Sequence, residues 1–209
     1  PATSVGGRVT PAIDSFQFGP YQYQNLETAY SQPATIYADL KYETESIALS
    51  SLCVKRLRAE LPEILANCGK KQDANVQQPD LPIKISKLTT RASSTDTSAI
   101  VYLEILLTKV KQGQVVSGGD ISGQQTTPAA AQVEFEATVN RQQASCSGIG
   151  INRIEFRQNE NEKLIKCNIN IPIEGDHFDA PIRIKMGYGF IQSVIGPKIS
   201  LRKEEQFIA

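Results

Sequence analysis

The chain has 209 residues, of which 40 % are hydrophobic and 7 % aromatic, and it contains no tryptophan. Its 22 basic and 22 acidic residues give a formal net charge of zero, which argues against the strong positive field that non-specific binding of nucleic acid or of an anionic membrane requires. The composition excludes the disordered class and is typical of a single globular domain with a substantial core.

No targeting or membrane-spanning segment is predicted. Residues 1–30 contain no charged region followed by an apolar stretch. A start at Pro1-Ala2-Thr3 is typical of removal of an initiator Met before a small residue, although cleavage of a signal peptide or trimming of the chain would give the same start. The longest apolar stretch, residues 99–107, contains Glu104 and is far shorter than the roughly 20 residues of a membrane helix. We therefore expect cytoplasmic synthesis and no membrane partner.

Residues 1–40 are predicted to form an extended N-terminal arm. They are nearly uncharged and show neither helical nor strand periodicity, and Pro11, Pro20 and Pro33 would interrupt either element. Aromatic side chains are frequent here, which is unusual for a disordered linker. We expect these aromatic residues to lie on a surface, either of their own domain or of a neighbouring subunit, and so to mediate assembly: Phe16, Phe18, Tyr21, Tyr23, Tyr30 and Tyr37.

An amphipathic helix is predicted over residues 44–68. Its apolar residues recur at spacings near 3.6, with Thr44 as a plausible N-cap and Gly69 as a plausible residue after the C-terminus. Pro62 would end or kink the helix. The stripe is expected to cover one side of a sheet, with binding of a partner as the alternative.

After a polar linker at residues 70–80, the period of the hydrophobic pattern changes to two. This alternation is typical of half-buried strands and is clearest over residues 132–140, 165–173 and 182–186. Further strands are expected at residues 82–90, 99–111, 151–157 and 197–203.

These elements predict a mainly β fold. Because the strands follow one another without intervening helices, we expect residues 41–209 to form one antiparallel β-sandwich or barrel, with the single amphipathic helix packed outside and the extended N-terminal arm before it. The strand at residues 99–111 carries apolar side chains on both faces, so it is expected to be central, with the helix on one side and a second sheet on the other.

Residues 113–131 are predicted to form a long hairpin loop. The segment contains several Gly residues and Pro128, and its only charge is Asp120. Loops of this length are usually functional or disordered, and two interpretations stay open: insertion against another subunit, or a mobile loop tip.

The four cysteines, Cys53, Cys68, Cys146 and Cys167, form no C-x-x-C motif and are separated by 15, 78 and 21 positions. Free thiols are expected, because Cys167 falls on the apolar parity of a strand and a reduced Cys behaves as a small hydrophobic residue. Disulfide formation remains the alternative.

The single histidine, His177, is the one candidate for catalytic or metal chemistry. Asp176 and Asp179 flank it, and a His with carboxylates could bind a divalent metal or act as a general base. The spacing matches no defined site, and Gly and Asp between two strands are ordinary turn residues. No metal, cofactor or catalytic residue is therefore expected.

The function inferred from these patterns is structural rather than enzymatic. Arms and neutral loops can pack on neighbours or add strands to them, so we expect a homo-oligomer formed through the arm and loop 113–131. The hypothesis is a subunit of a self-assembling particle, either a virus or phage coat protein or a tail or tube protein. The zero net charge favours a tube, tail or outer-layer subunit, and nucleic acid is not expected as a direct high-affinity ligand. The alternatives are an intracellular β-domain that binds a peptide or small ligand as an adaptor, and an enzyme with an acid/base site around His177.

Overall fold

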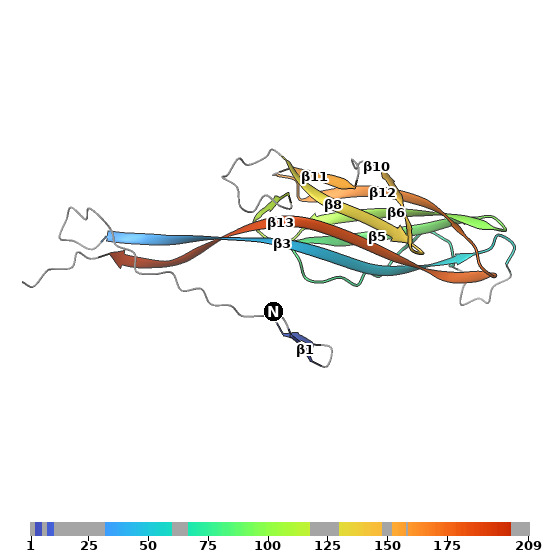
Figure 1. Ribbon diagram of the computed structural model, residues 1–209, viewed down its shortest axis with the longest axis horizontal. Coiled ribbons are helices and arrows are strands. Elements are labelled where there is room, and N and C mark those ends of the chain that lie inside the picture. Colours follow the sequence, from blue (N-terminus) through green and yellow to red (C-terminus); the bar gives the residue numbers. More distant parts are fainter. Residues whose placement is uncertain are drawn as a thin grey trace, which may run out of the picture. The chain divides into compact units, whose positions relative to one another are not determined.

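The structure is a computed structural model that describes residues 3–5, 8–10, 32–59, 67–117, 130–147, 152–157 and 159–201. The regular elements in these residues are all β-strands (Figure 1). The described ranges therefore contain no helix that is long and apolar enough to cross a membrane. The chain divides into two compact units, a larger one formed by Tyr37–Ile195 and a smaller one formed by Pro1–Ile36 with Gly196–Ala209.

A five-stranded antiparallel sheet forms one layer of the larger unit, with the strand order β10-β12-β6-β5-β4. The predicted central position of residues 99–111 is confirmed, because β6 lies in the middle of this sheet. The bounds are β4 (Gln72–Asp73), β5 (Ile83–Ser94), β6 (Ser98–Lys109), β10 (Ser145–Ser147) and β12 (Glu162–Pro172).

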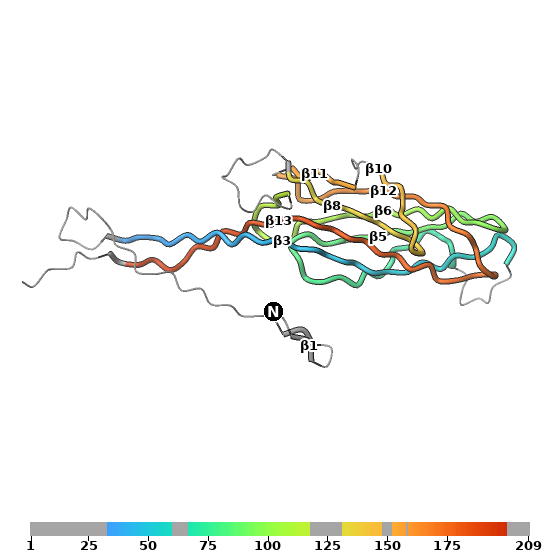
Figure 2. The backbone as a smooth tube through the Cα atoms, viewed as in Figure 1, coloured from blue at the N-terminus to red at the C-terminus, as the bar shows by residue number. Residues whose placement is uncertain are grey.

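A six-stranded sheet forms the second layer, with the order β11-β8-β13-β3, while β7 pairs with β13 and β9 pairs with β8. The long strands β3 and β13 can be followed side by side in Figure 2. The bounds are β3 (Gln32–Lys55), β7 (Gln114–Val116), β8 (Ala130–Val139), β9 (Gln142–Gln143), β11 (Arg153–Arg157) and β13 (His177–Leu201). In the smaller unit, β1 (Thr3–Val5) pairs antiparallel with β2 (Arg8–Thr10).

The two sheets share one hydrophobic core, which makes the fold β-sandwich-like. Alternate residues of β6 and β12 from one sheet and of β8 and β13 from the other are buried in a single cluster. The predicted inward parity of residues 132–140 and 165–173 is confirmed, since Val133, Phe135, Ile169 and Ile171 all belong to this cluster. Burial of each such side chain contributes roughly 1.5–3 kcal/mol, so the alternation fixes which face of each strand is inside.

The predicted helix over residues 44–68 is wrong. Residues 44–55 continue strand β3, and residues 60–66 lie outside the described residues. Ser46, Ala48 and Leu52 are almost fully buried, whereas Ile47 and Leu49 on the opposite parity are 37 % and 48 % exposed, which is a period of two. Pairing with β13 therefore overrides the local helical pattern. The expected helical cover on the outer face of β6 is absent as well, because the described residues contain no helix.

The predicted N-terminal arm also needs correction. Residues 32–40 belong to strand β3, and residues 11–31 lie outside the described residues. The strand predicted at residues 197–203 is not a separate element, because β13 runs without interruption to Leu201. Within the predicted loop 113–131, residues 114–116 form β7 and residues 130–131 begin β8, while residues 118–129 lie outside the described residues.

All four cysteines form disulfides, so the expectation of free thiols is wrong. Cys146 and Cys167 lie directly opposite each other on β10 and β12, with their Cα atoms 3.9 Å apart. Cys53 of β3 bonds to Cys68, with a Cα separation of 5.0 Å. Sequence spacing could not reveal either pair, because each depends on which segments the fold brings side by side.

The Cys53–Cys68 bond belongs to a set of contacts that joins neighbouring edges of the two sheets. The backbone N–H of Gly69 donates to the carbonyl of Cys53 at 3.0 Å, and that of Ala92 on β5 donates to the carbonyl of Gly69 at 2.9 Å. Further along, Leu49 of β3 and Gln77 exchange two backbone hydrogen bonds of 2.9 and 2.8 Å. The segment from Cys68 to Gln77 therefore covers this side of the fold and satisfies edge groups of both sheets.

Ile171→Asp should prevent soluble folding, because Ile171 is fully buried and would place an unpaired carboxylate in the core. Asn170→Asp is the matched control, because the adjacent side chain is exposed on the opposite face of β12. Soluble expression and thermal melting of the two variants measure the effect. Equal melting temperatures for the two variants would contradict the assigned parity of β12.

The double substitution Cys53→Ser with Cys68→Ser should lower the free energy of unfolding by about 3 kcal/mol, because a disulfide across a loop of this length restricts the unfolded chain. Urea denaturation of the oxidised wild type and of the variant measures the difference. A thiol reagent should find no reactive cysteine in the wild type denatured without reductant. Reaction of four thiols would contradict both pairings.

Candidate functional site

The structure places Asp176, His177 and Asp179 at the exposed start of β13. Asp176 is held in a structural contact, since its carboxylate lies 3.7 Å from the guanidinium of Arg56 and its carbonyl accepts a 2.8 Å hydrogen bond from the backbone N–H of Arg56. Among the described residues, no group of three or more His, Cys, Asp or Glu side chains is arranged to hold a metal ion. The weak metal candidates of the sequence therefore do not converge on a site.

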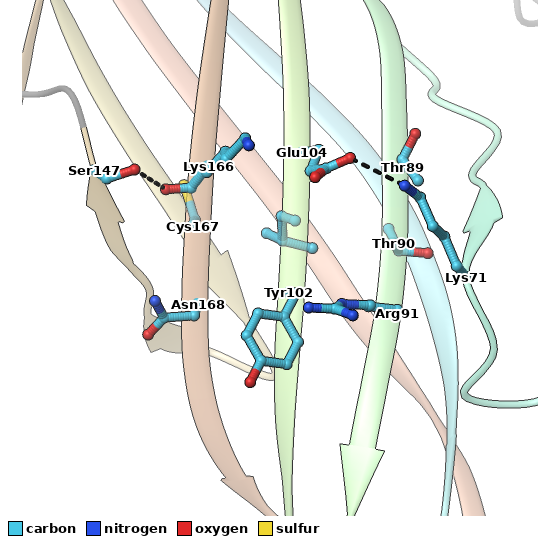
Figure 3. A pocket seen from close by; sticks show the side chains of 11 residues that line it. Lys71, Thr89, Thr90, Arg91, Tyr102, Glu104, Ser147, Lys166, Cys167 and Asn168 are labelled. Atoms are coloured by element: carbon cyan, nitrogen blue, oxygen red, sulfur yellow. Dashed lines mark hydrogen bonds and ion pairs between the residues drawn. The ribbon is translucent and has the colours of Figure 1, made fainter.

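A shallow polar pocket of about 320 Å³ lies on the outer face of the five-stranded sheet (Figure 3). Its position follows from strand register, which aligns outward-facing residues of neighbouring strands into rows across the sheet. One row runs through Ser147, Lys166, Glu104 and Thr89, and the next runs through Asn168, Tyr102 and Arg91. Lys71, from the segment before β4, completes the charged side chains of the lining.

The charges of this pocket are only partly compensated. Lys71 pairs with Glu104 at 3.5 Å. The guanidinium of Arg91 lies 4.3 Å from the centre of the Tyr102 ring, a cation–π contact. No described carboxylate forms an ion pair with Arg91 or with Lys166, which leaves two cationic groups available to a ligand.

A second feature is a two-stranded ribbon within the larger unit, formed by residues 37–41 of β3 and 191–195 of β13; we call it the exposed ribbon. The strands run antiparallel, since Ser193 donates a 2.6 Å hydrogen bond to the carboxylate of Asp39 and Lys185 forms a 2.7 Å ion pair with Glu45. Strand β7 pairs with β13 only as far as Ile191. From residue 192 onward, β3 is the only described strand that pairs with β13.

Both faces of the exposed ribbon carry apolar side chains. Tyr37 and Ile195 are 70 % and 68 % exposed and share a face with the Asp39–Ser193 contact, given the alternation of side chains along a strand. Leu40 and Val194 are each 49 % exposed and point to the opposite face. Single exposed apolar residues are ordinary on a protein surface, but four within one short ribbon form a local concentration.

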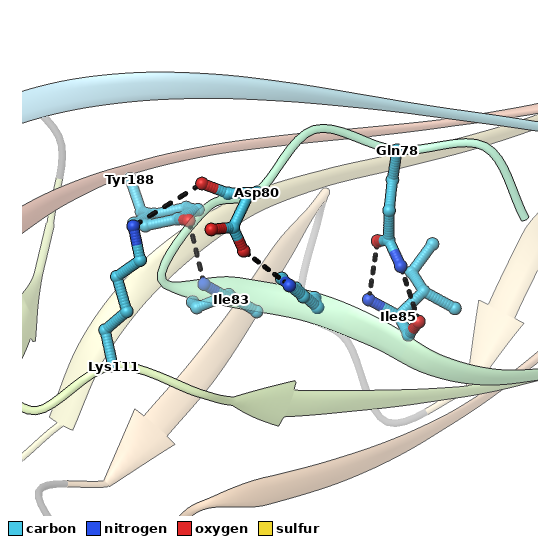
Figure 4. Close-up of polar contacts among 7 residues, drawn as sticks. Gln78, Asp80, Ile83, Ile85, Lys111 and Tyr188 are labelled. Atoms are coloured by element: carbon cyan, nitrogen blue, oxygen red, sulfur yellow. Dashed lines mark hydrogen bonds and ion pairs between the residues drawn. The ribbon is translucent and has the colours of Figure 1, made fainter. Parts of the chain in front are cut away.

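Tyr188 lies where the exposed ribbon meets the sandwich, which we call the root of the ribbon, and it hydrogen-bonds to the five-stranded sheet. This residue is 1 % exposed, and its hydroxyl accepts a 3.0 Å hydrogen bond from the backbone N–H of Ile83 on β5 (Figure 4). Burial raises the pKa of Tyr188 to about 12. Next to it, the fully buried Phe190 packs against the ring of Tyr42, with 5.8 Å between ring centres. Phe190 is therefore the last core residue of β13 before the exposed ribbon begins.

Gly113 packs closely against β13 at the root of the exposed ribbon. Its φ of +145° is unfavourable for other residues, and an added Cβ would lie 2.5 Å from the Phe190 ring and 2.6 Å from the carbonyl oxygen of Ile191. The loop that precedes β7 thus contacts β13 backbone and side chain where the core ends, and only glycine fits there.

Of the aromatic residues predicted to mediate assembly, Tyr37 lies in the exposed ribbon, while Phe16, Phe18, Tyr21, Tyr23 and Tyr30 lie outside the described residues. Sequence reasoning missed Leu40, Val194 and Ile195 as exposed apolar residues. One signal was present: the alternation that runs regularly to Phe190 ends there, and apolar residues then occur on both parities at Ile191, Val194 and Ile195.

No protein-family model matches this chain, and neither a search of curated proteins nor a search of solved structures finds a match.

Tyr188→Phe should change how stability depends on alkaline pH. The folded-state pKa of Tyr188 is raised above the value of about 10 in the unfolded chain. The contribution of neutral Tyr188 to wild-type stability is therefore fully present below pH 10 and is lost as pH rises through about 12. Between these limits the loss amounts to about 1.4 kcal/mol per pH unit. In the variant, which has no phenol to titrate, stability should not fall in this way between pH 10 and pH 12. At pH 8 the variant should be less stable than the wild type by about 1–3 kcal/mol, because the N–H of Ile83 loses its acceptor.

Urea denaturation of wild type and variant at pH 8 and pH 11 measures both effects, and the other titrating groups cancel in the comparison. If the two proteins lost the same stability between these pH values, the assignment of a buried neutral Tyr188 would be wrong.

Proposed function

We propose that this chain is a structural subunit that assembles with copies of itself into a particle, as in a virus or phage coat or a tail or tube. The observation that supports the proposal is the exposed ribbon, which presents apolar side chains on both faces where the sandwich core has ended. The proposal assigns the chain no chemical reaction and no cofactor.

A two-stranded ribbon has little stability of its own in water, because neither face is packed against a second layer. Tyr37 and Ile195 each keep more than two thirds of their surface in contact with water. Full burial of a large apolar side chain contributes roughly 1.5–3 kcal/mol, so a neighbour that covers either face would stabilise both the ribbon and the contact. This balance favours a ribbon that is covered in the working assembly.

The edges of the exposed ribbon offer a second type of contact. Beyond Ile191, the edge of β13 that β7 and β8 occupy further back has no described strand beside it. Free backbone N–H and C=O groups on such an edge can pair with a strand from another chain. In the proposed assembly a strand of the neighbouring copy occupies this edge, which gives a heterologous contact that builds rings or tubes.

The aromatic segment of residues 11–31 is the proposed source of further contacts. Phe16, Phe18, Tyr21, Tyr23 and Tyr30 have large apolar faces and are close in sequence to Tyr37. We propose that they pack on a neighbouring copy together with the ribbon, and that the part of the predicted loop between β7 and β8 adds a contact of the same kind.

The two disulfides indicate the redox environment in which such a particle would be stable. Disulfides persist in oxidising environments and are rare in the cytoplasm of most cells. Cytoplasmic synthesis was expected together with free thiols, and the two disulfides replace the free thiols. We propose that the assembled protein is exposed to an oxidising environment, as on the surface of a cell or of a virion.

The alternative function is that of a binding module, and the pocket on the five-stranded sheet is the observation that favours it. The oligomeric state separates the two functions. Size-exclusion chromatography with light scattering should show an oligomer whose mass is a multiple of 22.9 kDa. A monomer at every concentration would favour the binding module.

The double substitution Tyr37→Lys with Ile195→Lys should prevent assembly and leave the fold unchanged, because both side chains are exposed in the single chain and would place charges in the contact. Leu164→Lys is the matched control, since Leu164 is a 55 % exposed apolar residue on β12, away from the exposed ribbon. Light scattering, circular dichroism and melting are measured for all three proteins.

The expected result is a monomeric double variant with the wild-type spectrum and melting temperature, and a control that assembles like the wild type. Assembly of the double variant with unchanged affinity would rule out the exposed ribbon as the contact.

A further inference from the structure

We propose that the pocket on the outer face of β5, β6 and β12 binds an acidic saccharide, with the carboxylate or sulfate group of the ligand at Lys166 and Arg91. Both cations lie in the lining of a pocket of about 320 Å³ that lies entirely within the larger unit. The inference is independent of the proposed assembly, since it uses no residue of the exposed ribbon.

The charge of the lining favours an anion. Three cationic side chains, Lys71, Arg91 and Lys166, face a single carboxylate, that of Glu104. The 3.5 Å pair between Lys71 and Glu104 uses that carboxylate. Arg91 and Lys166 remain without an anionic partner among the described residues, and a charge-assisted hydrogen bond to either is stronger than one to a neutral donor.

Arg91 is also held in place for this role. Figure 3 shows the Arg91 side chain beside the Tyr102 ring. Its guanidinium lies over this ring, 4.3 Å from the ring centre, which restricts the side chain without using its N–H donors. A planar fork of donors fixed in this way can bind two oxygens of a carboxylate or sulfate at once.

The acidic residue beside the pocket, Asp73, forms no ion pair with Arg91 or Lys166. Asp73 accepts a 2.7 Å hydrogen bond from the Thr89 hydroxyl and forms a 3.2 Å ion pair with Lys87. The hydrogen bond from Thr89 is the main cause of the lowered pKa of Asp73, and the hydrogen bond from Lys87 is the second cause. Asp73 is therefore ionised and already engaged with these two partners on β5.

The rest of the lining favours a ligand that carries hydroxyl groups. The amide of Asn168 makes no hydrogen bond to any described residue, so both a donor and an acceptor are available, and the Ser147 hydroxyl donates to the carbonyl of Lys166 at 3.2 Å while its lone pairs stay free. An apolar ligand would bury these groups without partners, which is unfavourable, whereas sugar hydroxyls can donate and accept. The shallow shape suits a segment of a saccharide chain that lies across the sheet.

Isothermal titration of the full chain at low salt tests the proposal with defined probes. They are a hexuronic acid oligomer, a sulfated oligosaccharide, a neutral oligosaccharide of the same length, sodium sulfate, and a single-stranded DNA oligonucleotide. We expect binding of the uronate or the sulfated probe and none of the neutral one. The acidic probe that binds identifies the oxyanion.

Lys166→Gln and Arg91→Gln should each weaken this binding about tenfold or more, as expected for loss of a charge-assisted hydrogen bond. Arg183→Gln is the matched control, because it removes the same charge from β13 on the outer face of the other sheet, where Arg183 forms no ion pair with a described residue. Circular dichroism checks that all three variants are folded. An equal loss in the control would contradict the assignment of the site.

Hydrogen exchange of the wild-type protein gives a test that needs no variant. Saturation with the bound probe should protect residues 166–168 and 102–104 and leave β3 and β13 unchanged. The proposal fails if no acidic saccharide binds, if sodium sulfate or DNA binds as tightly as the saccharide, or if the protected residues lie elsewhere.

Discussion

The fold depends on the contact between the two sheets, in which alternate side chains from each sheet meet in one core. This contact ends at the point along the strands where one of the two sheets ends. On β13 the core side chains continue through Tyr188 and Phe190, and the hydrogen bond from Ile83 to the Tyr188 hydroxyl marks the last tie to the opposite sheet. Beyond this point β3 and β13 keep pairing with each other and lose the second layer. The exposed ribbon is therefore a direct consequence of strand length: two strands are longer than the sheet that faces them.

The sandwich and the exposed ribbon differ in how their strand edges are covered. Along the sandwich, the segment from Cys68 to Gln77 hydrogen-bonds to β3 and is linked to it by the Cys53–Cys68 disulfide. On the other side of the five-stranded sheet, β10 covers the edge of β12 and is fixed there by Cys146–Cys167. Covered edges of this kind cannot recruit another chain. The described edge of β13 beyond Ile191 has no such cover, so a strand of another chain can add there.

Much of this fold could be predicted from the sequence, and the failures have identifiable causes. Residues 132–139 of β8 and 165–172 of β12 alternate strictly, since one face must be buried. In β3 the inward residues include Ser46, which is small and polar, and the outward residues include the apolar Ile47 and Leu49, so the alternation is weak and a helical period fits by chance. The partner of β3 is β13, more than a hundred residues away, and no local window contains that information. The disulfides and the pocket share this dependence on register between distant strands, which left Arg91 and Lys166 unremarked.

The shape of each surface limits what it can bind. The exposed ribbon carries Tyr37 and Ile195 on one face and Leu40 and Val194 on the other, and a ribbon with two open faces cannot enclose a small molecule. Only another extended surface can cover it, which is why the ribbon favours association with a macromolecule. The pocket on the five-stranded sheet has the opposite character, since its charged and amide groups are exposed to solvent, and close packing against an apolar surface would leave Lys166 unpaired. The pocket and the exposed ribbon share no residue, so the two proposed functions use separate elements of one subunit.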